Sequence, residues 1–322
     1  MTDWRPTSGV DAAKRRARMI GRIRDYFEAE NVLAVETPAL SPTAGSDPNI
    51  ESLVVRSGLA PDRDLFLHTS PEFYMKRLLA AGYPDIYSIC RVFRDGEAGR
   101  RHQPEFTMLE WYRIGFGLTD IIEDTCSLIA NALQLADPAV DRLNYEEAFL
   151  RYTGLNPLSA SIDELADSVH AGRDLRASLG EDRDAWLDLA LSLEVAPRFA
   201  TNRLTVMTHY PASQAALARI CPLNSDVADR FEVFFGATEL ANGYVELTDA
   251  DEQAQRIDRE LASRAAAGQP ANPPDAALLA AMQSGMPRCS GVAVGVERLQ
   301  MVLDGTDDIA DVLTFRFGQE DD

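Results

Sequence analysis

The sequence predicts an α+β fold, in which a mainly antiparallel β-sheet is flanked by helices. Strand patterns follow one another with few long helices between them, which is typical of antiparallel rather than doubly wound sheets. Two short apolar runs, joined by a charged turn within residues 88–113, predict a β-hairpin. The chain has 322 residues, of which 46% are hydrophobic, so it is long enough to bury a sizeable core.

The amino-acid composition argues against several classes of protein. Lys and Arg number 31 and Asp and Glu 51, which gives a net charge of −20. This balance disfavours a broad nucleic-acid-binding face, because such a face needs positive charge along the phosphates. No run of 18 apolar residues and no signal-peptide core is found, so we expect a cytoplasmic protein with no membrane contact. The four cysteines are scattered, without a histidine at ligand spacing, which predicts reduced thiols rather than a zinc site or disulfides.

The N-terminal region predicts a flexible tail over residues 1–10 and a helix from Asp11. Apolar residues recur there at steps of three and four and so share one stripe: Ala13, Ala17, Ile20, Ile23 and Phe27. The other faces carry a run of basic side chains. That run fits a solvated helix face, and it also fits a docking surface for an acidic macromolecule.

The next segments predict short strands and helices. Residues 31–40 predict a strand that ends at Pro38, which cannot donate to a sheet ladder. A loop and a strand follow over residues 41–55, and residues 64–83 predict a strand and then a helix. Ser70 suits the N-cap of that helix, and Pro71 suits its first position. After the hairpin, a helix is expected near residues 118–136.

The rest of the chain predicts a helical insertion around residues 137–225 and then a return to the sheet. Residues 230–249 are strand-rich, residues 250–268 form a charged helix, and residues 271–275 form a turn. A strand running into a helix closes the pattern over residues 291–303. We therefore expect one domain over residues 11–322, with the insertion as part of it.

The hairpin carries an unusual set of side chains. Alternation along its second strand places an aromatic ring, a thioether, a carboxylate and a phenol on one face: Phe106, Met108, Glu110 and Tyr112. Arg94, on the preceding strand, can present a bidentate guanidinium to a phosphate or carboxylate. This face suits a pocket for a flat ring and a cation, although an exposed, salt-bridged hairpin also fits the pattern.

Two later segments suit the same chemistry. Glu239 and Glu246 are seven residues apart, and a bulge at Asn242-Gly243 would bring both carboxylates to one side, as a magnesium site requires. In residues 291–298, glycine and alanine alternate with valine, which leaves one strand face open to a ligand and places Arg298 at a helix start. Solvated acids and tight sheet packing are the alternative interpretations. Taken together, the segments favour ATP, attacked at its α-phosphorus by a substrate carboxylate without an enzyme nucleophile.

These segments resemble the catalytic domain of class II aminoacyl-tRNA synthetases, close to the lysyl enzyme. The helix with residues 31–40 resembles motif 1, residues 91–113 resemble motif 2, and residues 291–303 resemble motif 3. Little sequence precedes motif 1, so no anticodon-binding domain is expected. The chain thus resembles the truncated paralogues of that enzyme, the elongation factor P lysine ligases. Ala293, where lysyl-tRNA synthetases tend to have glycine, agrees with this.

The resemblance implies a homodimeric ligase. It would activate (R)-β-lysine, or lysine, as an adenylate with ATP and Mg²⁺, and transfer it to the ε-amino group of one lysine on elongation factor P, without tRNA. Arg94 and Arg298 would be catalytic, at the α- and γ-phosphate. The implied ATP site comprises Arg94, Asp95, Gly96, His102, Gln103, Phe106, Glu239, Leu240, Gly295 and Arg298. The implied amino-acid site comprises Ser70, Pro71, Glu72, Tyr112, Asn242 and Glu246, and the implied metal ligands are Glu239 and Glu246.

One departure from the family affects adenine recognition. The Arg-x-Glu of motif 2 reads Arg94-Asp95-Gly96, so Glu97 or backbone groups would have to contact the base instead. The alternatives are a lysyl-tRNA synthetase-like or other amino-acid ligase on the same scaffold, and an inert paralogue that acts as a regulatory subunit. Inert paralogues would be expected to lose a motif arginine, whereas Arg94 and Arg298 are both present.

Overall fold

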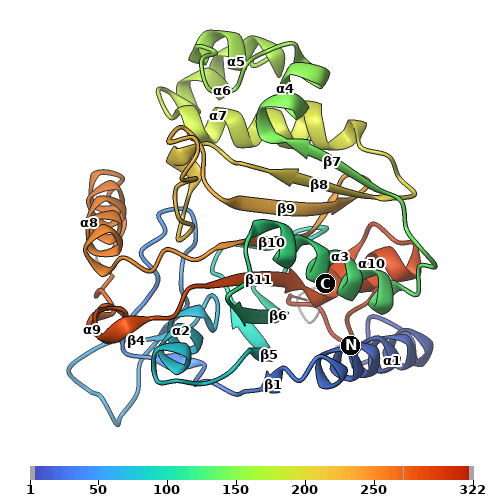
Figure 1. Cartoon of the computed structure of the whole chain (residues 1–322), viewed down its shortest axis with the longest axis vertical. Helices are drawn as coiled ribbons and strands as arrows, with labels where there is room; N and C mark the ends of the chain where they lie inside the picture. Colours follow the sequence, from blue (N-terminus) through green and yellow to red (C-terminus); the bar gives the residue numbers. More distant parts are fainter. Residues whose placement is uncertain (1–3, 271, 319–322) are drawn as a thin grey trace.

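The computed structural model describes residues 4–270 and 272–318, and it confirms the predicted α+β fold. Its main sheet has eight strands (Figure 1), in the spatial order β1 (Leu33–Ala34), β5 (Ile86–Phe93), β6 (Glu105–Ile114), β11 (Cys289–Gly295), β10 (Thr238–Val245), β9 (Arg230–Phe235), β8 (Leu204–Thr208) and β7 (Val140–Asn144). Only β1–β5 and β7–β8 are parallel pairs. The predicted hairpin is β5–β6, with Ser88 opposite Glu110.

One face of the sheet packs against three helices, which are α1 (Val10–Ala29), α3 (Leu118–Leu133) and α10 (Val296–Asp304). Leu109 and Trp111 of β6 point into the apolar core between the sheet and these helices. Because side chains alternate along a strand, Met108 and Glu110 point to the opposite face. That opposite face therefore has room for a ligand site.

The opposite face is bordered by α2 (Glu72–Ala80), α8 (Ala250–Ala266) and α9 (Ala276–Gly285), at the left of Figure 1. The chain also forms a separate, small antiparallel sheet, in the order β2 (Leu40–Ser41), β4 (Leu65–Leu67) and β3 (Val54–Val55). The sequence predicted α2 and α8 but not α9. Helix α2 begins at Glu72, one residue later than predicted, and the Ser70 hydroxyl accepts a hydrogen bond from the Glu72 amide.

The predicted helical insertion is only partly helical. Four short helices, α4 (Tyr145–Thr153), α5 (Ile162–Ser168), α6 (Arg173–Leu179) and α7 (Arg183–Ala190), pack on a separate apolar core. Strands β7 and β8, however, lie within residues 137–225 and extend the main sheet. The sequence did not reveal them because each has only five residues. The insertion is therefore continuous with the sheet at its far edge (Figure 1).

The described N-terminal and C-terminal segments lie side by side. Residues 1–3 of the predicted tail and residues 319–322 of the predicted domain lie outside the described residues. The amides of Thr7 and Ser8 donate to the carbonyls of Thr314 and Leu313, at 2.7 and 3.1 Å, so this part of the tail is attached to the C-terminal segment. Within the described ranges, no helix is both long enough and apolar enough to cross a membrane.

Candidate active site

Two adjoining cavities lie on the face of the sheet that α3 leaves open. The first has a volume of about 210 Å³ and the second about 180 Å³. Strands β6, β10 and β11 contribute to both. Five residues line both cavities and so mark the junction between them: Ile50, Arg94, Met108, Asn242 and Ala293.

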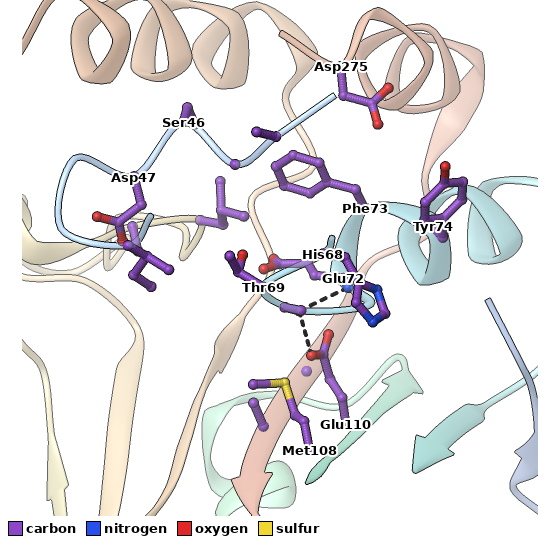
Figure 2. A pocket seen from close by; sticks show the side chains of 18 of the residues that line it. Ser46, Asp47, His68, Thr69, Glu72, Phe73, Tyr74, Met108, Glu110 and Asp275 are labelled. Atoms are coloured by element: carbon purple, nitrogen blue, oxygen red, sulfur yellow. Dashed lines mark hydrogen bonds between the residues drawn. The ribbon is translucent and has the colours of Figure 1, made fainter. Parts of the chain in front are cut away.

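Six acidic side chains line the first cavity. Three of them, Glu72, Glu110 and Glu246, lie close enough to interact electrostatically with one another. Figure 2 shows Glu110 and Met108 at one end of it. Both oxygens of Glu110 accept hydrogen bonds, from the hydroxyls of Ser70 and Tyr112, each at 2.7 Å. These bonds fix the carboxylate toward the cavity.

The ammonium of Lys76 lies behind the wall of this cavity, between two of the carboxylates. Its Nζ is 2.6 Å from Glu72 Oε1 and 2.6 Å from Glu246 Oε2, and the side chain is 1% exposed. Burial by itself lowers the pKa of Lys76, but the two carboxylates outweigh burial and raise it. Lys76 therefore stays charged, and it compensates only part of the negative charge around the cavity.

The negative charge that Lys76 does not compensate helps to raise the pKa values of the carboxyl groups. Burial, then the charge of Glu72, raises the pKa of Glu110 to about 7. Burial raises the pKa of Glu246 to about 8, although Lys76 opposes the shift. Among the described residues, Oε1 of Glu246 has no hydrogen-bond partner. A positively charged ligand would stabilise the ionised forms of Glu110 and Glu246, so this cavity favours a cationic ligand.

Strand β11, which lies beside these carboxylates, has almost no side chains on the cavity face, as the alternation in residues 291–295 predicted. A Cβ on Gly291 would lie 2.4 Å from Glu246 Oε1 and 2.5 Å from Tyr112 Cε1. Ala293 borders both cavities. Glycine at position 291 is thus required for Glu246 and Tyr112 to occupy their places.

The second cavity is lined by the Phe106 ring and by three arginines, Arg94, Arg101 and Arg298. The Arg94 guanidinium lies 5.1 Å from the centre of the Phe106 ring. Arg298 contacts Glu239 Oε2 at 3.1 Å and His102 Nε2 at 2.7 Å. Burial, and then the charge of Arg298, lowers the pKa of His102, which favours the neutral ring. A flat ring beside convergent cations suits a nucleotide.

Most residues predicted for the two sites line the corresponding cavity. In the second cavity these are Arg94, His102, Gln103, Phe106, Glu239, Leu240, Gly295 and Arg298. In the first they are Ser70, Glu72, Tyr112, Asn242 and Glu246. Asp95, Gly96 and Pro71 line neither cavity, whereas Glu97 lines the second. Asp95 and Gly96 are instead exposed on the hairpin turn.

The structure does not bring the two predicted metal ligands together. The bulge in β10 lies between Glu239 and Ala241 rather than at Asn242-Gly243. It places Glu239 and Glu246 on one face, but they stay roughly 20 Å apart along the strand. Glu239 lines the second cavity and Glu246 the first. The two carboxylates therefore cannot share one ion, and Glu246 already binds Lys76.

A different carboxylate lies near Glu239. Glu232 of β9 pairs with Asn242, and the charge of Glu239 contributes, after burial, to raising the pKa of Glu232 to about 7. Glu232 also pairs with Arg230 at 2.7 Å and Glu239 with Arg298 at 3.1 Å, so a divalent cation would share these two carboxylates with the arginines. The sequence analysis overlooked Glu232, and also Lys76. Signals for both exist: Glu232 precedes Glu239 by seven residues across the β9–β10 turn, and Lys76 follows Glu72 by one helical turn.

A further group of ligand-type side chains lies outside both cavities. One potential ligand atom each from His209, Cys221 and Asp229 lies within 4.8 Å of the others. The fold assembles this group from the loop between β8 and β9, so spacing along the sequence did not reveal it. Asp229 Oδ2 already accepts a hydrogen bond from Arg219 at 2.7 Å.

Comparison with known proteins agrees with this site. Residues 1–317 match the family described as tRNA synthetases class II (D, K and N). The chain is 43% identical over 318 residues to the elongation factor P–(R)-beta-lysine ligase of Photorhabdus laumondii subsp. laumondii. It is 44% identical over 318 residues to the protein of the same name from Erwinia tasmaniensis. Each alignment covers 97% of this chain and 97% of the relative. The predicted resemblance is confirmed.

Gly291→Ala should close the first cavity. The added methyl group would overlap Glu246 and Tyr112, so we expect a dicationic amino acid such as lysine to bind at least about tenfold more weakly in calorimetry. Gly295→Ala is the matched control, because its Cβ would meet nothing closer than the Arg298 side chain at 3.9 Å. Equal affinity in the two variants would show that the amino acid binds elsewhere.

Glu110 should make stability depend on pH. Its pKa is about 7 in the folded protein, against about 4.3 for an unperturbed glutamate. Between these values the folded state holds a proton that the unfolded state has released, so the free energy of unfolding falls as pH rises through this window. Chemical denaturation from pH 5 to 7 should show wild type losing on the order of 1–3 kcal/mol relative to Glu110→Gln. Glu105→Gln, exposed on the same strand, should parallel wild type; a Glu110→Gln curve that also did so would contradict the buried, neutral carboxyl.

Proposed function

Because the chain belongs to the class II tRNA synthetase family (D, K and N), we propose that it activates (R)-β-lysine, or lysine, with ATP and transfers it to a lysine ε-amino group of elongation factor P. The observation that carries the proposal is the pair of adjoining cavities. One holds the carboxylates of Glu72, Glu110 and Glu246 for a dicationic amino acid, and the other has an aromatic ring and arginines for a nucleotide. The names of the two relatives support the same substrate pair.

The amino acid would bind in the first cavity through its two ammonium groups. Glu110, Glu246 and the Tyr112 hydroxyl suit one ammonium, and Glu72, whose Oε1 also accepts from Tyr244 at 2.8 Å, suits the other. A neutral side chain would leave these carboxylates without a partner, which is a strong basis for discrimination. The substrate carboxylate then has to face the junction with the second cavity, where Arg94 lies.

The first half-reaction needs positioning and charge stabilisation only. A carboxylate oxygen attacks the α-phosphorus of ATP, a carboxyl–phosphate bond forms, and pyrophosphate leaves. Arg94 lies where the two substrates meet, and Arg298 lies deeper in the nucleotide cavity. Their guanidinium groups stabilise the charge that develops on the phosphates. In the second half-reaction, the acceptor amine attacks the adenylate carbonyl and AMP leaves.

We propose Glu232 and Glu239 as the groups that hold magnesium. Their carboxylates lie on neighbouring strands and repel one another, and Glu239 borders the nucleotide cavity. Mg²⁺ would neutralise charge on the phosphates when it is bound with ATP. This pair takes the place of the predicted pair Glu239 and Glu246.

Homodimerisation, a cytoplasmic location and independence from tRNA stay predictions. Charging of bulk tRNA would favour a lysyl-tRNA synthetase-like enzyme. Absence of pyrophosphate exchange with every diamino acid would favour an inert paralogue.

Intact mass spectrometry tests the function directly. Incubation with ATP, Mg²⁺, (R)-β-lysine and elongation factor P should raise the mass of elongation factor P by one β-lysyl residue. Substitution of the acceptor lysine by arginine should abolish the gain. An unchanged mass, with charged tRNA formed in a parallel reaction, would refute protein ligation.

Arg298→Ala should slow pyrophosphate exchange by about 100- to 1,000-fold, because it removes a cation from the site of charge development. Arg100→Ala is the control, since Arg100 is exposed and pairs with Asp307 outside the cavity. Circular dichroism should show both variants folded. Wild-type exchange in Arg298→Ala would remove Arg298 from the mechanism.

A further inference from the structure

One carboxylate of the first cavity has no role in the reaction so far described. Glu260 of α8 lines the cavity, and it accepts a hydrogen bond from the hydroxyl of Ser46. Ser46 is buried in the loop after β2, at 7% exposure. No lysine or arginine among the described residues forms an ion pair with Glu260. A partly buried acid is thus held toward the cavity without a cation of its own.

Glu260 lies beside the loop of residues 42–50, whose Ile50 also borders the second cavity. Figure 2 shows Met108 and Glu110 at one end, Ser46, Asp47 and Asp275 toward the other, and Glu72 and Phe73 between them. Burial is the main cause of a raised pKa at Glu260, and the charges of Asp47 and Glu72 add to it, whereas Ser46 and Arg256 lower it. Glu260 is therefore within electrostatic reach of Glu72, the carboxylate assigned to the amino acid.

Two other carboxylates that line this cavity have structural roles. Asp275 Oδ1 accepts from the amides of Ala277 and Leu278 and caps α9. Asp47 Oδ1 accepts from the amide of Asn49 within the loop. Glu260 accepts only the Ser46 hydroxyl among the described residues, so it has free acceptor capacity.

The second half-reaction needs a group of this kind. A lysine ε-amine has a pKa of about 10.4, so the acceptor arrives as an ammonium ion that cannot attack a carbonyl. It must be attracted to the cavity and must lose a proton there. A carboxylate with raised proton affinity and no competing cation provides both functions.

We propose that Glu260 is the catalytic residue that binds the acceptor lysine ammonium and accepts its proton. The inference rests on the proposed function. As the acceptor nitrogen forms its bond to the adenylate carbonyl carbon, the carbonyl–phosphate ester bond breaks and AMP leaves with that electron pair. Before the attack the ammonium gives one proton to Glu260, which Ser46 holds in place, and becomes a neutral amine. The second proton, which the nitrogen loses as the amide forms, leaves with the AMP phosphate.

Glu260→Gln separates the two half-reactions. Pyrophosphate exchange with β-lysine should stay at the wild-type rate, because adenylate formation does not use Glu260. Transfer from preformed adenylate to elongation factor P, in single turnover, should slow by about 100- to 10,000-fold. Asp258→Asn, exposed on the same helix, should leave both steps unchanged.

Hydroxylamine distinguishes a proton acceptor from a structural residue, because this amine is uncharged at neutral pH and needs no base to become nucleophilic. Glu260→Gln should transfer β-lysine to hydroxylamine at the wild-type rate while it fails with elongation factor P. Equal slowing with both acceptors, or wild-type transfer to elongation factor P, would overturn the assignment. Absence of exchange in the wild type would overturn the proposed function together with this inference, and is seen before any variant is made.

Discussion

The site depends on the two ion pairs that Lys76 makes with Glu72 and Glu246, each at 2.6 Å. They join α2 to the end of β10 and allow carboxylates to be buried at the edge of a cavity. Loss of either partner would leave a charge buried without compensation, which is costly. One ammonium cannot balance Glu72, Glu110 and Glu246 together, so the pKa values of Glu110 and Glu246 are raised in the empty site. Lys76 thus leaves part of the negative charge of these carboxylates uncompensated, and a dicationic amino acid would compensate the rest.

The same strands build the neighbouring nucleotide cavity, which explains why no nucleophile is needed. Strand β6 carries Phe106 toward one cavity and Glu110 toward the other, and β11 contributes Gly295 and Gly291 in the same way. Arg94 lies where the cavities meet. A single sheet face therefore fixes the distance between the two substrates. Catalysis of the first half-reaction then reduces to alignment and to stabilisation of phosphate charge, while we assign the acceptor amine to a separate carboxylate, Glu260.

Local patterns predicted much of this arrangement. Alternation along residues 104–113 identified the cavity face of β6, and the glycines of residues 291–295 identified the bare strand face. Contacts between segments that are distant in the sequence could not be predicted from these patterns. The distance along β10 that separates Glu239 from Glu246 excludes a shared ion, and the approach of Glu232 depends on the pairing of β9 with β10. The roles of Lys76 and Glu260 also depend on packing of α2 and α8 against the sheet, which no periodicity reports. The five-residue strands β7 and β8 were missed because so short a run has no distinctive pattern.

A crystal structure with an unreactive analogue of β-lysyl-adenylate tests the central claim most directly. The account predicts the adenine ring beside Phe106, the phosphate at Arg94, and one ammonium within hydrogen-bonding distance of Glu110 and Glu246. An analogue with its ammonium groups directed to solvent, or with its base in the cavity between Glu72 and Glu246, would contradict the account.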